Sequence, residues 1–158
     1  MVKTELDRMQ ALSVIVPVEQ PTEWVSSMTV VRNKDKVRIF LDPARLNAAI
    51  MRQHTHLPTI EELLAKIKNG KVFSHLDLKD GYWQIPLTEE SSYLTTFNMP
   101  FGRFRYTRLP FGLVSAGDVF QLQMTRTFKG IDGVLVLHDD ILIHTETDVD
   151  HERVLRKV

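Results

Sequence analysis

Apolar and polar positions follow more than one period along the chain, which predicts a mixture of helices and strands. Helical spacing of apolar residues marks three segments, at residues 6–12, 60–68 and 115–128. β-branched or alternating runs mark strands at residues 14–16, 27–31, 36–41, 72–76, 94–98, 103–108, 134–138 and 141–143. The two element types are interspersed along the chain, without a linker or a repeat between them.

Local signals support two of the helix starts. Thr59, with Glu62 three residues later, matches a capping box and opens the helix that ends near residue 68. Asp42 followed by Pro43 matches an N-cap with proline at the first helical position, leading into residues 44–50.

Length and composition narrow the class of protein. The chain has 158 residues, 43% of them apolar and 25% charged, which is typical of one globular domain. Twenty basic and twenty acidic residues balance, so bulk charge indicates neither a nucleic-acid partner nor a membrane partner. The absence of cysteine excludes disulfides, thiolate zinc sites and a cysteine nucleophile. No apolar run approaches the ~20 residues of a spanning helix, and we expect an intracellular protein without a membrane partner.

Three carboxylates carry the candidate chemistry. Asp139 and Asp140 stand between the apolar runs 134–138 and 141–143, and Asp77 ends the separate strand 72–76. If these strands are neighbours in one sheet, the three acids meet at one edge, where they suit two Mg²⁺ ions about 4 Å apart in a phosphoryl transfer. An Asp-Asp pair between strands is more often a plain hairpin turn, and spacing alone leaves both interpretations open.

Several ordered motifs resemble the reverse transcriptases of gypsy-type LTR retrotransposons. They are LDLKDGYWQIPL at 76–87, FG at 101–102 with LPFGL at 109–113, and DDILI at 139–143. Residues 21–28 and 38–47 resemble the fingers of the same enzymes. The resemblance runs from about residue 6 to residue 155.

This resemblance implies an α+β fold with a right-hand polymerase palm, an antiparallel sheet backed by helices, and an N-terminal fingers extension. The chain is then a single reverse transcriptase domain fragment. The fingers occupy roughly 1–70 and about 88–110, and the palm roughly 71–87 and 111–158. We expect the thumb, connection and RNase H regions to be absent.

The implied activity is RNA-directed DNA synthesis, in which dNMP is transferred to a primer 3′-hydroxyl. Asp77, Asp139 and Asp140 are the implied catalytic residues and, with the Leu78 carbonyl, the implied metal ligands. Mg²⁺ is the implied cofactor, with Mn²⁺ as a substitute. The implied partners are an RNA or DNA template with primer, dNTPs and the remainder of a polyprotein.

The resemblance also assigns the substrate-binding residues. The backbone of Asp80 and Gly81 lies near the triphosphate, Arg38 grips the triphosphate, Tyr82 excludes a ribose 2′-hydroxyl, and Phe111 and Gly112 line the nucleotide pocket. Without the motifs, the aromatic residues at 82, 83 and 111 are better explained as core residues.

Nucleic-acid contacts would depend on local basic clusters that bind phosphates without regard to sequence. The candidates are the hairpin residues Arg32, Lys34, Lys36 and Arg38, then Lys66, Lys68 and Lys71, and finally Arg103, Arg105 and Arg108. For the lysines a solvated helix end is an equally good interpretation.

Four departures from the family pattern predict reduced activity. Leu137-His138 replaces Tyr-x before the two aspartates, and Ser115-Ala116-Gly117 ends in glycine where proline is usual. The turn at 32–36 lacks a glycine and a lysine, and Ser13 replaces a glycine. These departures indicate a degenerate or lineage-specific copy, and the length of the chain indicates a truncated one. The alternatives are an inactive remnant that binds nucleic acid or protein, and a carboxylate-metal phosphohydrolase.

Overall fold

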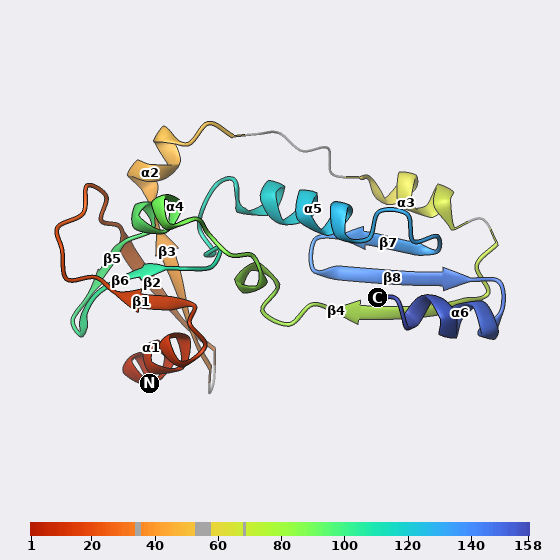
Figure 1. Ribbon diagram of the computed structural model, residues 1–158, viewed down its shortest axis with the longest axis horizontal. Helices are drawn as coiled ribbons and strands as arrows, with labels where there is room; N and C mark the ends of the chain where they lie inside the picture. Colours follow the sequence, from red (N-terminus) through yellow and green to blue (C-terminus); the bar gives the residue numbers. More distant parts are fainter. Residues whose placement is uncertain (34–35, 53–57, 68) are drawn as a thin grey trace. The chain divides into compact units, whose positions relative to one another are not determined.

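Antiparallel strand pairs and short helices build both of the units into which the chain divides in this computed structural model, which describes residues 1–33, 36–52, 58–67 and 69–158 (Figure 1). Unit 1 comprises Met1–Arg52 and Tyr82–Ala116, and unit 2 comprises Gln53–Gly81 and Gly117–Val158. The mixed α and β composition expected from the sequence is confirmed in each unit.

Unit 1 holds a three-stranded sheet and a separate hairpin. The sheet has the order β1-β6-β5, with β1 at Ile15–Pro17, β5 at Phe97–Met99 and β6 at Gly102–Tyr106. The hairpin pairs β2 at Ser27–Asn33 with β3 at Lys36–Asp42. The helices are α1 at Val2–Ala11, α2 at Ala44–Ala49 and α4 at Glu89–Leu94, and a 3₁₀ turn, η1, begins at Gly81 and ends at Gln84.

The core of unit 1 follows from the spacing of its apolar residues. Leu6 and Met9 lie three positions apart on α1, so they share one face of the helix, and both are buried. They belong to the same cluster as Ile39 and Leu41, which alternate along β3. Tyr106 of β6 completes this cluster, and its burial raises the pKa of its phenol well above the usual value, with a smaller contribution from Glu5.

Unit 2 is a three-stranded antiparallel sheet with helices. The sheet has the order β4-β8-β7, with β4 at Val72–Asp77, β7 at Val134–Leu137 and β8 at Asp140–Thr145. The helices are α3 at Ile60–Lys66, α5 at Ala116–Thr127 and α6 at Asp148–Leu155, and α6 packs against β8 and β4 (Figure 1).

The alternation of β8 gives this sheet a buried face and an open face. Ile141 and Ile143 are buried, as are Phe120 and Met124 of α5 and Val154 of α6. Residues 140, 142 and 144 point to the opposite face, because successive side chains of a strand alternate.

Two local expectations were wrong. Residue 94 ends helix α4 instead of opening a strand, because Thr88 caps this helix by accepting a hydrogen bond from the Ser91 amide. The N-cap of α2 is Pro43 and not Asp42, and it makes no side-chain capping bond. The capping box of Thr59 and Glu62 is confirmed. Among the helices of the described residues, none has the length and apolar content needed to cross a membrane.

Candidate active site

Asp77 and Asp140 are direct partners across two strands of unit 2. The register of the antiparallel β4–β8 pair sets Asp77 opposite Asp140, with Leu76 opposite Ile141. Directly opposed residues of an antiparallel pair have their Cβ atoms about 5 Å apart on one face of the sheet. The expectation that the strand ending at Asp77 and the strand beginning near Asp140 are neighbours in one sheet is therefore confirmed.

Asp139 lies in the turn that joins β7 to β8. Leu137 pairs with Asp140, so the two turn residues are His138 and Asp139. The expected turn of Asp139 and Asp140 was thus displaced by one residue, because Asp140 already pairs in the ladder. The Leu78 amide donates to the Asp139 carbonyl at 2.9 Å, which ties the turn to the end of β4. All three acidic residues meet at one edge of the sheet.

The side chain of Asp140 is turned along the sheet toward His75. Nε2 of His75 lies 2.7 Å from Oδ1 of Asp140. Three carboxylates and a main-chain carbonyl are the oxygen donors that Mg²⁺ prefers, so the residues fit this ion in chemistry and in backbone position. Over the described residues, however, no group of three or more His, Asp or Glu side chains is arranged to hold a metal ion. The contact with His75 engages Oδ1, one of the two carboxylate oxygens of Asp140.

Gln121 holds the turn from the side of α5, and the sequence did not single it out. Its side chain is buried, Oε1 accepts from the His138 amide at 2.7 Å, and Nε2 donates to the Val136 carbonyl at 3.2 Å. His138 has a φ of 53°, an uncommon conformation for a residue with a side chain. The sequence did contain a signal for this role, because Gln121 is a polar residue among the apolar positions of the predicted helix 115–128.

Asp80 and Gly81 follow the same strand end. Asp80 has a φ of 53°, and the Gly81 amide donates to the Leu78 carbonyl at 3.2 Å. A Cβ at Gly81 would lie 2.8 Å from the ring of Phe120, so only glycine fits this close approach to α5. Asp80 and Gly81 are the third and fourth residues after the end of β4, and they belong to unit 2, which also holds the three acidic residues.

The aromatic residues assigned to the nucleotide pocket gather in unit 1. The rings of Tyr82 and Phe111 are stacked, with centroids 4.6 Å apart and planes at 24°. Phe40 of β3 meets the edge of Phe111 at 5.9 Å. Arg38 lies two residues before Phe40 on the same face of β3 and is exposed. Gly112 follows Phe111 and has a φ of 108°.

The basic candidates differ in how they are held. Arg103 donates to Oδ1 of Asn98 at 3.0 Å, and Arg105 donates to Ser92 and lies 4.3 Å above the ring of Tyr93. Arg108 reaches the Gln84 carbonyl at 3.5 Å. Lys34 and Lys68 lie outside the described residues. The proposed phosphate contacts of these clusters stay predictions.

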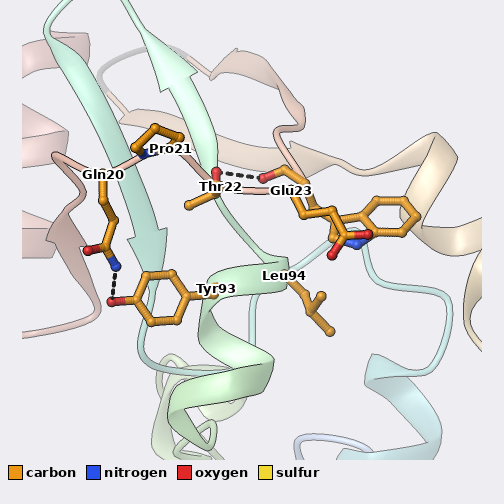
Figure 2. A pocket seen from close by; sticks show the side chains of 7 residues that line it. Gln20, Pro21, Thr22, Glu23, Tyr93 and Leu94 are labelled. Atoms are coloured by element: carbon orange, nitrogen blue, oxygen red, sulfur yellow. Dashed lines mark hydrogen bonds between the residues drawn. The ribbon is translucent and has the colours of Figure 1, made fainter.

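A cavity of about 280 Å³ lies in unit 1. It is lined by residues 20–24 and by Tyr93 and Leu94 of α4, and Gln20 donates to the Tyr93 hydroxyl at 2.8 Å (Figure 2). Its lining includes none of the predicted site residues.

Comparisons with known proteins agree with the motifs. The family model described as "Reverse transcriptase (RNA-dependent DNA polymerase)" matches residues 27–158. The chain is 38% identical over 161 residues to the "Uncharacterized protein K02A2.6" of Caenorhabditis elegans, covering 99% of this chain and 12% of that protein. It is 37% identical over 113 residues to the "Retrovirus-related Pol polyprotein from transposon 412" of Drosophila melanogaster, covering 70% of this chain and 9% of that protein.

A solved structure gives the same result for the fold. The foamy viral protease-reverse transcriptase in complex with ds DNA superposes with a TM-score of 0.87 at 26% identity, over 99% of this chain and 27% of that one. The predicted fold class, a polymerase palm with a fingers extension, is confirmed. The chain spans 9–27% of the length of these three proteins. It belongs to the reverse transcriptase (RNA-dependent DNA polymerase) family, whose members related to it include a transposon Pol polyprotein.

Proposed function

We propose that this chain carries the nucleotidyl-transfer site of an RNA-directed DNA polymerase, with Asp77, Asp139 and Asp140 as its catalytic carboxylates. The observation that supports it most is the pairing of Asp77 with Asp140, together with the 2.9 Å bond from the Leu78 amide to the Asp139 carbonyl. This pairing gathers three acids from two distant segments of the chain in one place, where divalent ions can bind.

The carboxylates act by position and charge. Asp77 and Asp140 hold oxygen ligands on one face of the sheet, and Asp139 supplies a third carboxylate from the turn, with the Leu78 carbonyl beside it. Two bound Mg²⁺ ions would lower the barrier by stabilising the negative charge on the attacking and leaving oxygens. The primer 3′-hydroxyl releases its proton to water and its O3′ forms a bond to the α-phosphorus of a dNTP. The bond from that phosphorus to the bridging oxygen breaks, and pyrophosphate leaves.

The remaining assigned residues bind the nucleotide. The backbone at Asp80 and Gly81 faces the triphosphate, and Arg38 offers a guanidinium that can hold two phosphate oxygens at once. Tyr82 excludes a ribose 2′-hydroxyl, while Phe111 and Gly112 line the pocket around the base and sugar. The stack of Tyr82 on Phe111 supports this role, because it fixes the ring of Tyr82 in one orientation.

Within the reverse transcriptase family, we assign the chain to a gypsy-type retrotransposon. The words LDLKDGYWQIPL and DDILI support it, and so does the similarity to a transposon Pol polyprotein. In this assignment residues 1–70 and 88–110 are fingers, and residues 71–87 and 111–158 are palm. The partners are a template with primer and the remainder of a polyprotein, and Leu137-His138 in place of Tyr-x lowers the rate.

Primer extension tests the proposal directly. The 158-residue chain is incubated with poly(rA)/oligo(dT), dTTP and Mg²⁺ or Mn²⁺, beside Asp139→Asn and the control Asp132→Asn, an exposed aspartate in the loop before β7. We expect metal-dependent extension that falls at least about 100-fold in Asp139→Asn and is retained in Asp132→Asn.

Two other results would contradict the proposal. Incorporation by the parent chain at the level of Asp139→Asn would favour an inactive remnant. Release of phosphate from dTTP without primer, lost in Asp139→Asn, would favour a carboxylate-metal phosphohydrolase.

A further inference from the structure

We propose that Asn47 is a positioning residue that sets the preference of the nucleotide pocket for deoxyribose over ribose, by fixing the backbone that carries Phe111. This inference rests on the proposed function, in which Tyr82 excludes the 2′-hydroxyl. Asn47 itself touches none of the reacting groups and acts through Phe111 and Tyr82.

Both polar atoms of the Asn47 side-chain amide form hydrogen bonds with the same loop. Nδ2 donates to the Gly112 carbonyl at 2.9 Å, and Oδ1 accepts from the Val114 amide at 2.9 Å. The two bonds span the backbone that follows Phe111, so the side chain holds this loop at two points. Both partners are main-chain groups, and the contact therefore constrains the path of the backbone instead of one rotamer.

The helix that carries Asn47 is itself fixed. Leu46, its neighbour on α2, is 4% exposed, and the Asn47 amide donates to the Pro43 carbonyl at 2.7 Å. Pro43 directly follows the end of β3, so the short helix is attached to the strand that carries Phe40. Asn47 thus links the loop after Phe111 to the end of β3, so the position of the strand constrains the position of the loop.

Gly112 shows how closely the loop lies on β3. A Cβ at this position would stand 2.0 Å from the Leu41 carbonyl oxygen and 3.5 Å from Cδ of Pro43. With a φ of 108°, the residue is also in a conformation that glycine alone adopts without strain. The backbone of the loop is therefore packed against the end of β3 on one side and held by Asn47 on the other.

The fixed loop holds the side chain of Phe111 in one orientation. Its ring stacks on Tyr82 at 4.6 Å and meets the edge of Phe40 at 5.9 Å. Tyr82 is therefore supported by a ring whose backbone is followed directly by the two bonds of Asn47. Exclusion of a single hydroxyl depends on the placement of the excluding ring within about 1 Å. Loss of the Asn47 bonds loosens Phe111, and Tyr82 then tolerates the 2′-hydroxyl.

Equilibrium binding of dATP and ATP to the 158-residue chain, with Mg²⁺ and measured by calorimetry, tests the inference. The ratio of Kd for ATP to Kd for dATP is expected to fall about fivefold in Asn47→Ala. It should also fall in Asn47→Asp, which keeps the acceptor for Val114 but sets a carboxylate against the Gly112 carbonyl. Gln20→Ala, which removes an amide hydrogen bond to Tyr93 elsewhere in unit 1, should leave the ratio unchanged.

Two further measurements separate positioning from general loss of structure. Hydrogen exchange at the Val114 amide should speed up in Asn47→Ala, while the thermal transition stays within a few degrees of the parent. In a Tyr82→Ala background, adding Asn47→Ala should change the binding ratio no further, since Asn47 acts through that ring.

The outcomes distinguish the two proposals. A parent chain that binds dATP more tightly than ATP, with the same ratio in Asn47→Ala, overturns this inference and leaves the proposed function standing. A ratio that falls equally with and without Tyr82 also overturns it. A parent chain that binds neither nucleotide contradicts the proposed function and, with it, the role given to Asn47.

Discussion

His75 and Asp140 form a side-chain contact at the acidic edge of the sheet of unit 2, with 2.7 Å between Nε2 and Oδ1. The pair is diagonal across the two strands, because His75 is opposite Leu142 and Asp140 is opposite Asp77. The two side chains are 62% and 56% exposed, so the contact is screened by water and weak. It nevertheless engages Oδ1, one of the two oxygens through which this proposed metal ligand would bind an ion.

Removal of His75 should therefore strengthen divalent-ion binding. In His75→Ala, Oδ1 of Asp140 loses this partner and both oxygens are open to an ion. We expect the Kd for Mn²⁺ to fall about threefold, as measured by electron paramagnetic resonance of free Mn²⁺. His144→Ala is the matched control, because His144 lies on the same face of β8 opposite Phe73. An unchanged or weaker affinity in His75→Ala would show that the contact does not compete with the ion.

The opposition of Asp77 and Asp140 should cost stability when no metal is bound. Like charges directly opposite in an antiparallel pair repel by roughly 0.2–1 kcal/mol. Asp77→Asn should therefore raise the Tm by about 1–3 °C in a metal-free buffer of low ionic strength. The gain should shrink in high salt, whereas Asp132→Asn should change the Tm little. A lower Tm for Asp77→Asn in differential scanning calorimetry would contradict the repulsion.

Burial of the Tyr106 phenol predicts a loss of stability at alkaline pH. The folded state raises the pKa of Tyr106, so the native chain keeps a proton that the unfolded chain releases above pH ~10. This contribution to stability is complete below the unfolded pKa and is lost as the pH rises above it, by at most about 1.4 kcal/mol per pH unit.

Urea unfolding between pH 9 and pH 11 measures this slope. Tyr106→Phe should remove the contribution of this one proton to the slope. An identical slope in the parent chain and in Tyr106→Phe would show that another group causes the alkaline loss.

The sequence predicted those features of the fold that depend on interactions between residues close together in the chain. The capping box of Thr59 and Glu62, the β7–β8 hairpin and the strand that ends in Asp77 all follow from local chemistry and alternation. That β4 pairs with β8 came from the family resemblance and not from the pattern, since residues 77 and 140 are far apart in the chain. The displaced turn has a local cause: an Asp-Asp pair does not show which aspartate continues the ladder.

The contacts that position the site could not be predicted from spacing. Asn47 and Gln121 act on backbone groups of segments that lie far away in the sequence, and a side-chain amide inside a predicted helix does not name its partner. The contact of Asp140 with His75 could not be predicted from the sequence either. It depends on the side-chain rotamer of Asp140 and on the register of β4 and β8, which the sequence does not give.

Gln121 provides the clearest test of how the acidic turn is held. Replacement by leucine keeps most of the buried volume but leaves the His138 amide and the Val136 carbonyl without this partner. A buried polar group left unsatisfied costs about 1–3 kcal/mol, and these two groups are only partly buried, so Gln121→Leu should lower the free energy of unfolding by about 1–3 kcal/mol in urea. Because His138 directly precedes Asp139, the turn should also loosen and Mn²⁺ binding should weaken. Gln123→Leu, at an exposed position two residues along α5, should change neither quantity. Mn²⁺ binding should be compared at a temperature where both chains are folded. If Gln121→Leu is destabilised but binds Mn²⁺ as tightly as the parent, Gln121 has a structural role only. The stability of the hairpin would then be independent of the geometry of its aspartates.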